Sequence, residues 1–270
     1  MSIRQPSFFD DADWRVTPYI DQRLTAGDRF WLFAEQVPRL LNEIDNVKAS
    51  TTYTDDERLT RLLDYLRRLT VIKAHFDAWP ADLAADKGSQ PLCWEAHTQM
   101  HFAEPALNSA FPTSYRFIDV ETSELMVQYW IFYSYLIRTL LEHQSQLSQQ
   151  YQYPLPHPPS ATYSDLIILH THLRLALEYN IRQSRQNYMT MMFRVWYSLV
   201  QLIGFYGDDP RMFQLELQWC FAVREVVEEQ TMNGQWKGVL RQMGWGPASE
   251  KVKESLIETL KLEEGSRKAE

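Results

Sequence analysis

Apolar residues recur at the spacing of an α-helix along most of this chain. The first such run follows Asp28, which predicts the N-cap of a helix. A second run follows residues 54–57 (Thr-Asp-Asp-Glu), the pattern of a capping box, and we expect Pro80 to end it. The apolar positions of the two runs are Phe30, Trp31, Phe33, Val37, Leu40, Leu41 and Ile44, and then Leu59, Leu62, Leu63, Leu66, Leu69, Ile72, Phe76 and Trp79.

The rest of the chain predicts further helices separated by two weaker regions. Residues 81–118 contain three prolines and little periodicity, so we expect loops and short helices there. Residues 144–160, rich in Gln, Ser and Pro, predict a long exposed loop. The other expected helices are an apolar one capped by Asp119, two over 163–182 and 189–205, one that begins at Asp208-Asp209-Pro210, and two short ones over 236–243 and 249–262.

These patterns predict an all-α fold with about eight to ten helices and no strand. We expect a single irregular helical domain over residues 28–262, with the 144–160 loop inserted in it. Residues 1–27 are expected to form a loosely held lead, and the polar residues 263–270 a frayed tail.

Composition excludes several classes of protein. The chain has a formal net charge of −8, which is the wrong sign for autonomous binding to a nucleic-acid backbone. Its two cysteines, Cys93 and Cys220, are too few for a disulfide framework or a cysteine-rich zinc module. With 9 glycines, it does not suit a glycine-rich dinucleotide or phosphate loop. The sequence also predicts no membrane span and no secretory signal, so we expect the nucleus or the cytoplasm.

Candidate chemistry is sparse, and each cluster has a simpler interpretation. His97 and His101 would share one face of a helix, a spacing that metal sites use, but no third ligand is evident. The pair His170 and His172 is a weaker signal still. The acidic runs 10–13 and 55–57 resemble Mg²⁺-binding motifs of terpenoid cyclases only superficially, since the second is explained as a helix start. We therefore expect no metal, no cofactor and no catalytic residue.

Aromatic residues are the other candidate for a site. The chain has 9 Trp, 14 Tyr and 13 Phe, which is enough to line a pocket for an apolar ligand, although helical spacing is more typical of a plain core. The candidate pocket residues on the predicted central helices are Trp130, Tyr133, Trp196 and Trp219. Cys220 is expected in the core. Arg58, Arg61, Arg67 and Arg68 are interpreted as one solvated basic face.

Four segments in order carry a resemblance to a known family. They are Phe76-Asp77-Ala78-Trp79, then Phe111-Pro112 with Tyr115-Arg116-Phe117, then Tyr129-Trp130, and then Asp209-Pro210-Arg211 with Glu216-Leu217-Gln218-Trp219-Cys220. A turn with Gly244-Trp245-Gly246 follows. Over about residues 60–262 the chain resembles the C-terminal helical region of fungal-specific zinc binuclear cluster transcription factors. Two departures are the absence of the six-cysteine DNA-binding module and the absence of a proline near 187–195.

The resemblance implies a transcription-factor-like regulatory protein, associated with a fungal secondary-metabolite gene cluster. It would act through a protein partner or by sensing a small apolar ligand, without direct DNA binding, and the resemblance supplies no catalytic residues. The alternative is a helical enzyme of specialised metabolism, a terpenoid cyclase or an isomerase with an aromatic-lined pocket. A third interpretation is a gene product that lacks an exon for the DNA-binding module.

Overall fold

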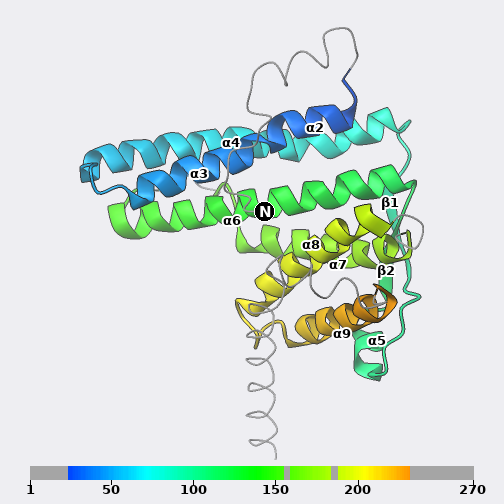
Figure 1. Ribbon diagram of the computed structural model, residues 1–270. Coiled ribbons are helices and arrows are strands. Elements are labelled where there is room, and N and C mark those ends of the chain that lie inside the picture. The colour runs from blue at the N-terminus through cyan, green and yellow to red at the C-terminus, as the bar shows by residue number, and fades with distance from the viewer. Residues whose placement is uncertain (1–23, 155–158, 184–187, 232–270) are drawn as a thin grey trace, which may run out of the picture. The chain divides into compact units, whose positions relative to one another are not determined.

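The computed structural model describes residues 24–154, 159–183 and 188–231. This part of the chain is mostly helical and contains one small two-stranded sheet, which confirms the predicted predominance of helices (Figure 1). The chain divides into two compact units. Unit 1 comprises Met1–Leu92 and Gln128–Leu169, and unit 2 comprises Cys93–Val127 and His170–Glu270.

Unit 1 begins with three helices: α2 (Ala26–Ala34), α3 (Gln36–Ala49) and α4 (Asp55–Asp86). The cap of α2 is Thr25 and not Asp28, because Asp28 is the third helical residue and completes a capping box with the Thr25 side chain. The predicted capping box of α4 between Thr54 and Glu57 is confirmed. Both α2 and α3 pack along α4, as Figure 1 shows.

The expectation that Pro80 ends the second helix is wrong. Helix α4 passes through Pro80 and ends at Asp86, just before Gly88, whose φ of +76° lies in the left-handed region that favours glycine. Trp79 and Leu83 lie on either side of the proline, and both are buried. Their packing offsets the loss of the helical hydrogen bond that proline, which has no backbone N–H, cannot donate.

Aromatic side chains fill the interior of unit 1. Phe30 packs against Trp79 and Phe76 with ring centroids 5.0 and 6.1 Å apart, and Trp79 stacks on Tyr129 at 5.1 Å. The indole nitrogen of Trp79 also donates to the backbone oxygen of Ala26 at 2.7 Å. This hydrogen bond and the ring contacts join the first turn of α2 to the second half of α4.

Two further helices, α6 (Val120–Tyr151) and α7 (Tyr163–Gln183), contribute residues to both units. The predicted cap of α6 is confirmed, since the Asp119 carboxylate accepts from the Thr122 backbone. The loop expected over residues 144–160 begins later than predicted, because α6 continues to Tyr151. The side chains of Gln144 and Leu147 are buried, and this burial holds the last turns of α6 in place despite their polar sequence.

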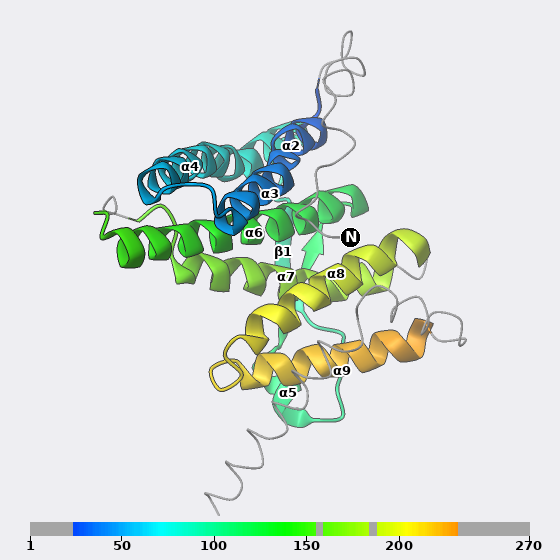
Figure 2. The ribbon, with the colours of Figure 1, turned by 60° about the vertical axis from the view of Figure 1, so that its left-hand side comes forward.

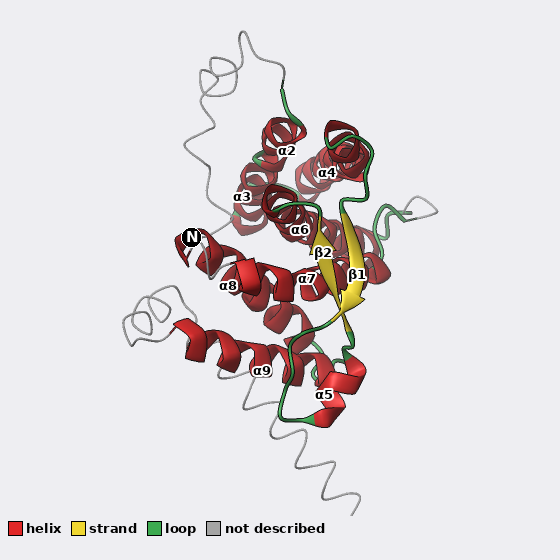
Figure 3. Cartoon of the chain, turned by 90° about the vertical axis from the view of Figure 1, so that its right-hand side faces the viewer, coloured by secondary structure: helices red, strands yellow, loops and turns green. Residues whose placement is uncertain are grey.

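Unit 2 contains the two strands, β1 (Cys93–His97) and β2 (Thr113–Phe117), with α5 (Pro105–Ala110) between them. The two strands are antiparallel and lie side by side (Figure 3). In their register Glu95 lies directly opposite Tyr115. The expectation of no strand is therefore wrong for the segment 81–118. The two strands are only five residues long, and β1 has no alternation of buried and exposed positions that could have revealed it.

Helices α8 (Tyr188–Gly207) and α9 (Gln214–Thr231) lie side by side in unit 2 (Figure 2). Helix α9 begins later than the predicted Asp208-Asp209-Pro210 start. The Asp209 carboxylate instead accepts from the Met212 backbone in the turn that leads into α9. Cys220, on α9, is buried as predicted.

Several predictions fall outside the described residues. They are the first 23 residues of the lead over 1–27, the helices over 236–243 and 249–262, and the tail over 263–270. The lead ends earlier than predicted, because α2 begins at Ala26. The described part of the chain holds fewer helices than the upper figure expected from the sequence. Among the described residues, no helix is long and apolar enough to cross a membrane.

A buried histidine makes unit 1 sensitive to acid. The side chain of His143 on α6 is fully enclosed. Burial and the neighbouring Lys48 ammonium lower the pKa of His143 from 6.5 to about 4, and the nearby Thr139 backbone offsets this only in part. The folded protein therefore holds this imidazole neutral.

We expect the free energy of unfolding to fall by about 2 kcal/mol from this group between pH 7 and pH 5. Above pH 6.5 the ring is neutral in both states and has no effect. Below 6.5 the unfolded chain takes up the proton, whereas the folded chain does so only near pH 4. Urea unfolding at the two pH values measures this decrease in the free energy of unfolding. The decrease should be smaller than in the wild type for His143→Leu and the same as in the wild type for the exposed control His75→Leu. An equal loss in both variants would assign the acid sensitivity to other groups.

Candidate functional site

The four aromatic residues predicted to line a pocket are divided between the two units. Trp130 and Tyr133 belong to unit 1, and Trp196 and Trp219 to unit 2. All four are buried. Tyr133 stacks on Phe76 with ring centroids 5.2 Å apart. No single pocket of the kind predicted is therefore formed within one unit, and a role for any of the four in ligand binding stays a prediction.

Each unit uses its aromatic residues in contacts with charged side chains as well as in packing. The Tyr133 hydroxyl donates to Asp77, which also accepts from Lys73 at 2.8 Å. Burial and the Asp77 carboxylate raise the pKa of Tyr133. In unit 2, the Arg174 guanidinium lies 5.9 Å from the ring centroid of Trp219. These are stabilising cation–π and hydrogen-bond contacts of a packed interior.

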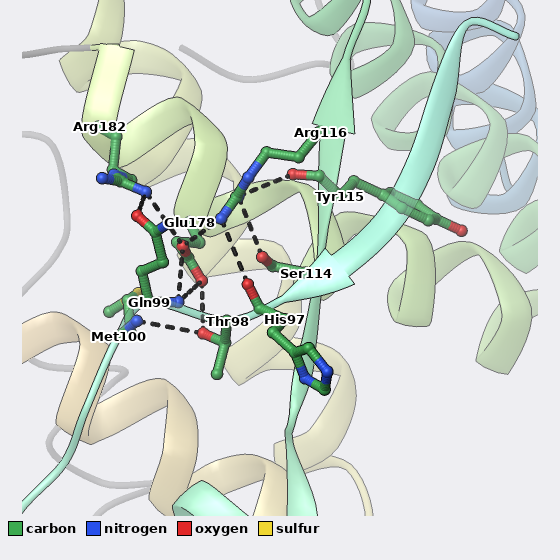
Figure 4. A network of polar contacts seen from close by, with 9 residues as sticks. All are labelled: His97, Thr98, Gln99, Met100, Ser114, Tyr115, Arg116, Glu178 and Arg182. Atoms are coloured by element: carbon green, nitrogen blue, oxygen red, sulfur yellow. Dashed lines mark hydrogen bonds and ion pairs between the residues drawn. The ribbon is translucent and has the colours of Figure 1, made fainter.

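Unit 2 contains a buried carboxylate that sequence analysis missed. Glu178 on α7 has only 2% of its side chain exposed. It accepts hydrogen bonds from the Thr98 hydroxyl and from the Gln99 backbone at 3.0 Å (Figure 4). It also accepts from the Arg116 guanidinium on β2 at 3.0 Å. Arg182, one turn further along α7, lies 3.9 Å from the same carboxylate.

The donors of this network come from two parts of unit 2. Thr98 and Gln99 directly follow β1 in the chain, and Arg116 lies near the end of β2. Burial alone would raise the pKa of Glu178, but the hydrogen bonds from Thr98, Gln99 and Arg116 outweigh it and lower the pKa. The carboxylate is thus ionised and occupied by protein donors. Its arrangement is that of a brace between α7 and the strands, not of a catalytic acid.

A tyrosine and a histidine form a second polar contact in unit 2. The Tyr115 hydroxyl lies 2.8 Å from Nδ1 of His172, and their rings are stacked. Burial lowers the pKa of His172, and the Glu95 carboxylate offsets this in part. Burial raises the pKa of Tyr115 to about 12. Both groups are neutral at pH 7, and burial also raises the pKa of the Cys93 thiol, so Cys93 is a weak nucleophile.

The histidine pair considered as a metal site does not lie on a helix. His97 ends β1 and His101 lies in the following loop, so helical spacing does not bring the two imidazoles to one face. Within the described ranges, no group of three or more His, Cys, Asp or Glu side chains could hold a metal ion.

The surface of unit 1 contains a groove between α3 and α4, with a volume of about 300 Å³. Leu40 and Ile72 form its buried apolar floor, and Val71, which is 52% exposed, lies beside them. The remaining lining residues are polar or positively charged: Gln36, Arg39, Arg67 and Arg68. None of the four predicted aromatic pocket residues lines this groove.

The lining of the groove carries three guanidinium groups and no carboxylate. Their present partners are Glu43, which pairs with Arg39 at 3.2 Å and with Arg68 at 2.7 Å, and Asp64, which pairs with Arg67 at 2.9 Å. Burial raises the pKa of Glu43, but Arg68 and Arg39 outweigh this and lower it. The groove therefore combines three arginines, paired with two carboxylates outside the lining, with the exposed apolar side chain of Val71.

The four arginines predicted to form one solvated face, Arg58, Arg61, Arg67 and Arg68, have different surroundings in the structure. The guanidinium carbon of Arg61 lies 4.4 Å from the centroid of the Tyr53 ring, and the Arg58 guanidinium donates to the backbone oxygen of Ser50. Only Arg67 and Arg68 reach the groove. The signal that could have found it is the pairing of α3 with α4, which depends on the turn over residues 50–54 and not on periodicity within either helix.

Comparison with known proteins gave no relative: no family model, no curated protein and no solved structure matches the chain. The resemblance to fungal zinc binuclear cluster transcription factors stays a prediction from the sequence motifs.

Proposed function

We propose that this protein is a transcription-factor-like regulatory protein of the nucleus or cytoplasm that works by binding and not by catalysis. The observation that carries the proposal is the groove of unit 1, which offers solvent three guanidinium groups beside an apolar floor. An open groove of mixed charge and apolar surface is typical of protein recognition. The family resemblance of the sequence supports the same function.

The polar groups of unit 2 also favour binding over catalysis. Catalytic acids and bases need a proton-accepting or proton-donating atom that a substrate can reach. The Glu178 carboxylate is instead occupied by Thr98, Gln99 and Arg116. Tyr115 and His172 are bonded to each other and neutral. These contacts fix the strands to α7 and leave the groove as the better candidate for function.

The proposal is tested by attaching the whole chain to a heterologous DNA-binding module and measuring transcription of a reporter gene in yeast. We expect the fusion to change reporter expression relative to the module alone. Val71→Glu, which places a charge in the groove, should abolish the change at equal protein level. Arg61→Glu, on the same helix but outside the groove, should preserve it.

The alternative function, a helical cyclase or isomerase, predicts a different result. An inert fusion, together with turnover of a prenyl diphosphate by the purified chain in the presence of Mg²⁺, would replace the regulatory proposal. An active fusion whose reporter response is unaffected by Val71→Glu would also contradict it.

A further inference from the structure

The groove between α3 and α4 has a chemistry that selects among partners. Its charged lining residues are all arginines, and two of them are well exposed: the side chains of Arg39 and Arg67 are 52% and 72% accessible. Leu40 and Ile72 below them are buried, so Val71 is the apolar lining residue that a partner can reach. A partner that fills the groove must therefore bring negative charge for the arginines and an apolar side chain for Val71.

The arginines retain donors for such a partner. A guanidinium carries five N–H donors and binds carboxylates in a planar fork. Among the described residues, Arg39, Arg67 and Arg68 each use one N–H on Glu43 or Asp64. Since Glu43 serves two guanidinium groups, three positive charges face two carboxylates. One additional carboxylate would balance the groove.

A charged and an apolar lining residue of the groove lie one helical turn apart, a separation that a third helix can match. Arg67 and Val71 are one turn apart on α4, as are Gln36 and Leu40 on α3. Neighbouring side chains one turn apart on a third helix have the same separation of about 5–6 Å. Such a helix can place a carboxylate against Arg67 and an apolar side chain against Val71 in successive turns.

We propose that this groove binds an amphipathic α-helix of a partner protein, with Asp and Glu at its edge and Leu or Phe at its centre. The proposal rests on the regulatory function proposed above and names the class of partner. The partner's carboxylates pair with Arg39, Arg67 and Arg68, and its apolar residues pack on the exposed side chain of Val71.

The test uses the full chain and a fluorescently labelled 16-residue helical peptide with this pattern. A twin peptide in which every Asp and Glu is replaced by Lys serves as the control. We expect fluorescence anisotropy to show binding of the acidic peptide but not of its twin, and binding should weaken as salt concentration rises.

Three variants locate the interaction. Arg67→Glu and Val71→Glu should each weaken binding about tenfold or more, which corresponds to 1.4 kcal/mol. Arg61→Glu makes the same change of charge on α4 as Arg67→Glu and should stay within about twofold, because Arg61 lies outside the groove. All three positions are exposed, so circular dichroism should show the same helix content in each variant.

Other occupants give distinct outcomes. Equal binding to all variants, or no binding of the acidic peptide, would overturn the proposal. Groove-dependent binding of a long-chain carboxylic acid without binding of the peptide would replace the helix with a small amphipathic anion. Binding of the peptide only after Asp10, Asp11 and Asp13 are all changed to Asn would assign the groove to the chain's own acidic segment.

The reporter assay keeps the two proposals separable. A reporter response that depends on Val71, with no binding of the acidic peptide, would reject the class of partner and retain the regulatory function. Peptide binding at the groove with an inert reporter would retain the interaction and reject the regulatory role.

Discussion

Replacing Glu178 with alanine should lower the free energy of unfolding by about 3–5 kcal/mol, the largest effect that we expect from a single polar residue of unit 2. The substitution removes an acceptor shared by Thr98, Gln99 and Arg116. It also leaves the Arg116 side chain, which is only 19% exposed, without the carboxylate that balances its charge. An uncompensated, partly buried charge accounts for most of the cost.

Urea unfolding followed by circular dichroism measures this loss. The Glu178→Gln side chain can still accept hydrogen bonds but carries no charge, so this variant should lower the free energy of unfolding less than the alanine variant does. Glu142→Gln, on the exposed surface of α6, is the matched control and should change stability by less than about 1 kcal/mol. If Glu178→Ala were as stable as this control, the brace assigned to Glu178 would not exist.

Replacing Trp79 with alanine should cost about 3–5 kcal/mol through the cavity left in unit 1. Trp79 is 1% exposed and contacts Phe30 and Tyr129 through its ring. The variant also loses the hydrogen bond to the Ala26 backbone, which adds about 1 kcal/mol. Trp79→Phe fills part of the cavity and should lie between the alanine variant and the wild type.

Trp94→Ala is the matched control, because Trp94 is 50% exposed on β1. Denaturant unfolding should show a loss several-fold smaller for this variant than for Trp79→Ala. The near-ultraviolet circular dichroism spectrum should change strongly only for Trp79→Ala, because the Trp79 ring of the wild type is held among other aromatic rings. Similar losses for the two variants would show that the aromatic interior does not stabilise unit 1 as described.

The function proposed here depends on a surface and not on the interior. Stability variants such as Glu178→Ala and Trp79→Ala should impair function only as far as they reduce the folded population. Variants at Val71 and Arg67 should impair partner binding while the protein stays folded, since both side chains are exposed. Comparison of the two classes separates the binding groove from the scaffold that supports it.

Local signals in the sequence were sufficient for several helix starts. The Thr54 capping box and the Asp119 cap depend on hydrogen bonds between residues three positions apart, so neighbouring residues determine them. The same reasoning misplaced the cap of α2 by three residues, because Asp28 suits both an N-cap and the third helical position. Local signals do not distinguish these two positions when Thr25 is also present.

Helix ends and strands were decided by contacts distant in sequence. Pro80 is a strong helix breaker in isolation, but burial of Trp79 and Leu83 carries α4 past it. Strands β1 and β2 are short and depend on each other for backbone hydrogen bonds across an intervening helix. Neither strand alone has a pattern that separates it from a loop.

The sequence by itself determined that this chain is mainly helical and where most helices lie, because helical periodicity and capping act within a few residues. The tertiary structure alone decided which side chains meet. It brought Glu178 to Thr98 and Arg116, and it placed Arg39 beside Arg67 to form the groove. The physical reason is that these contacts join residues dozens of positions apart, so only the packed helices bring them within hydrogen-bonding range or onto one surface.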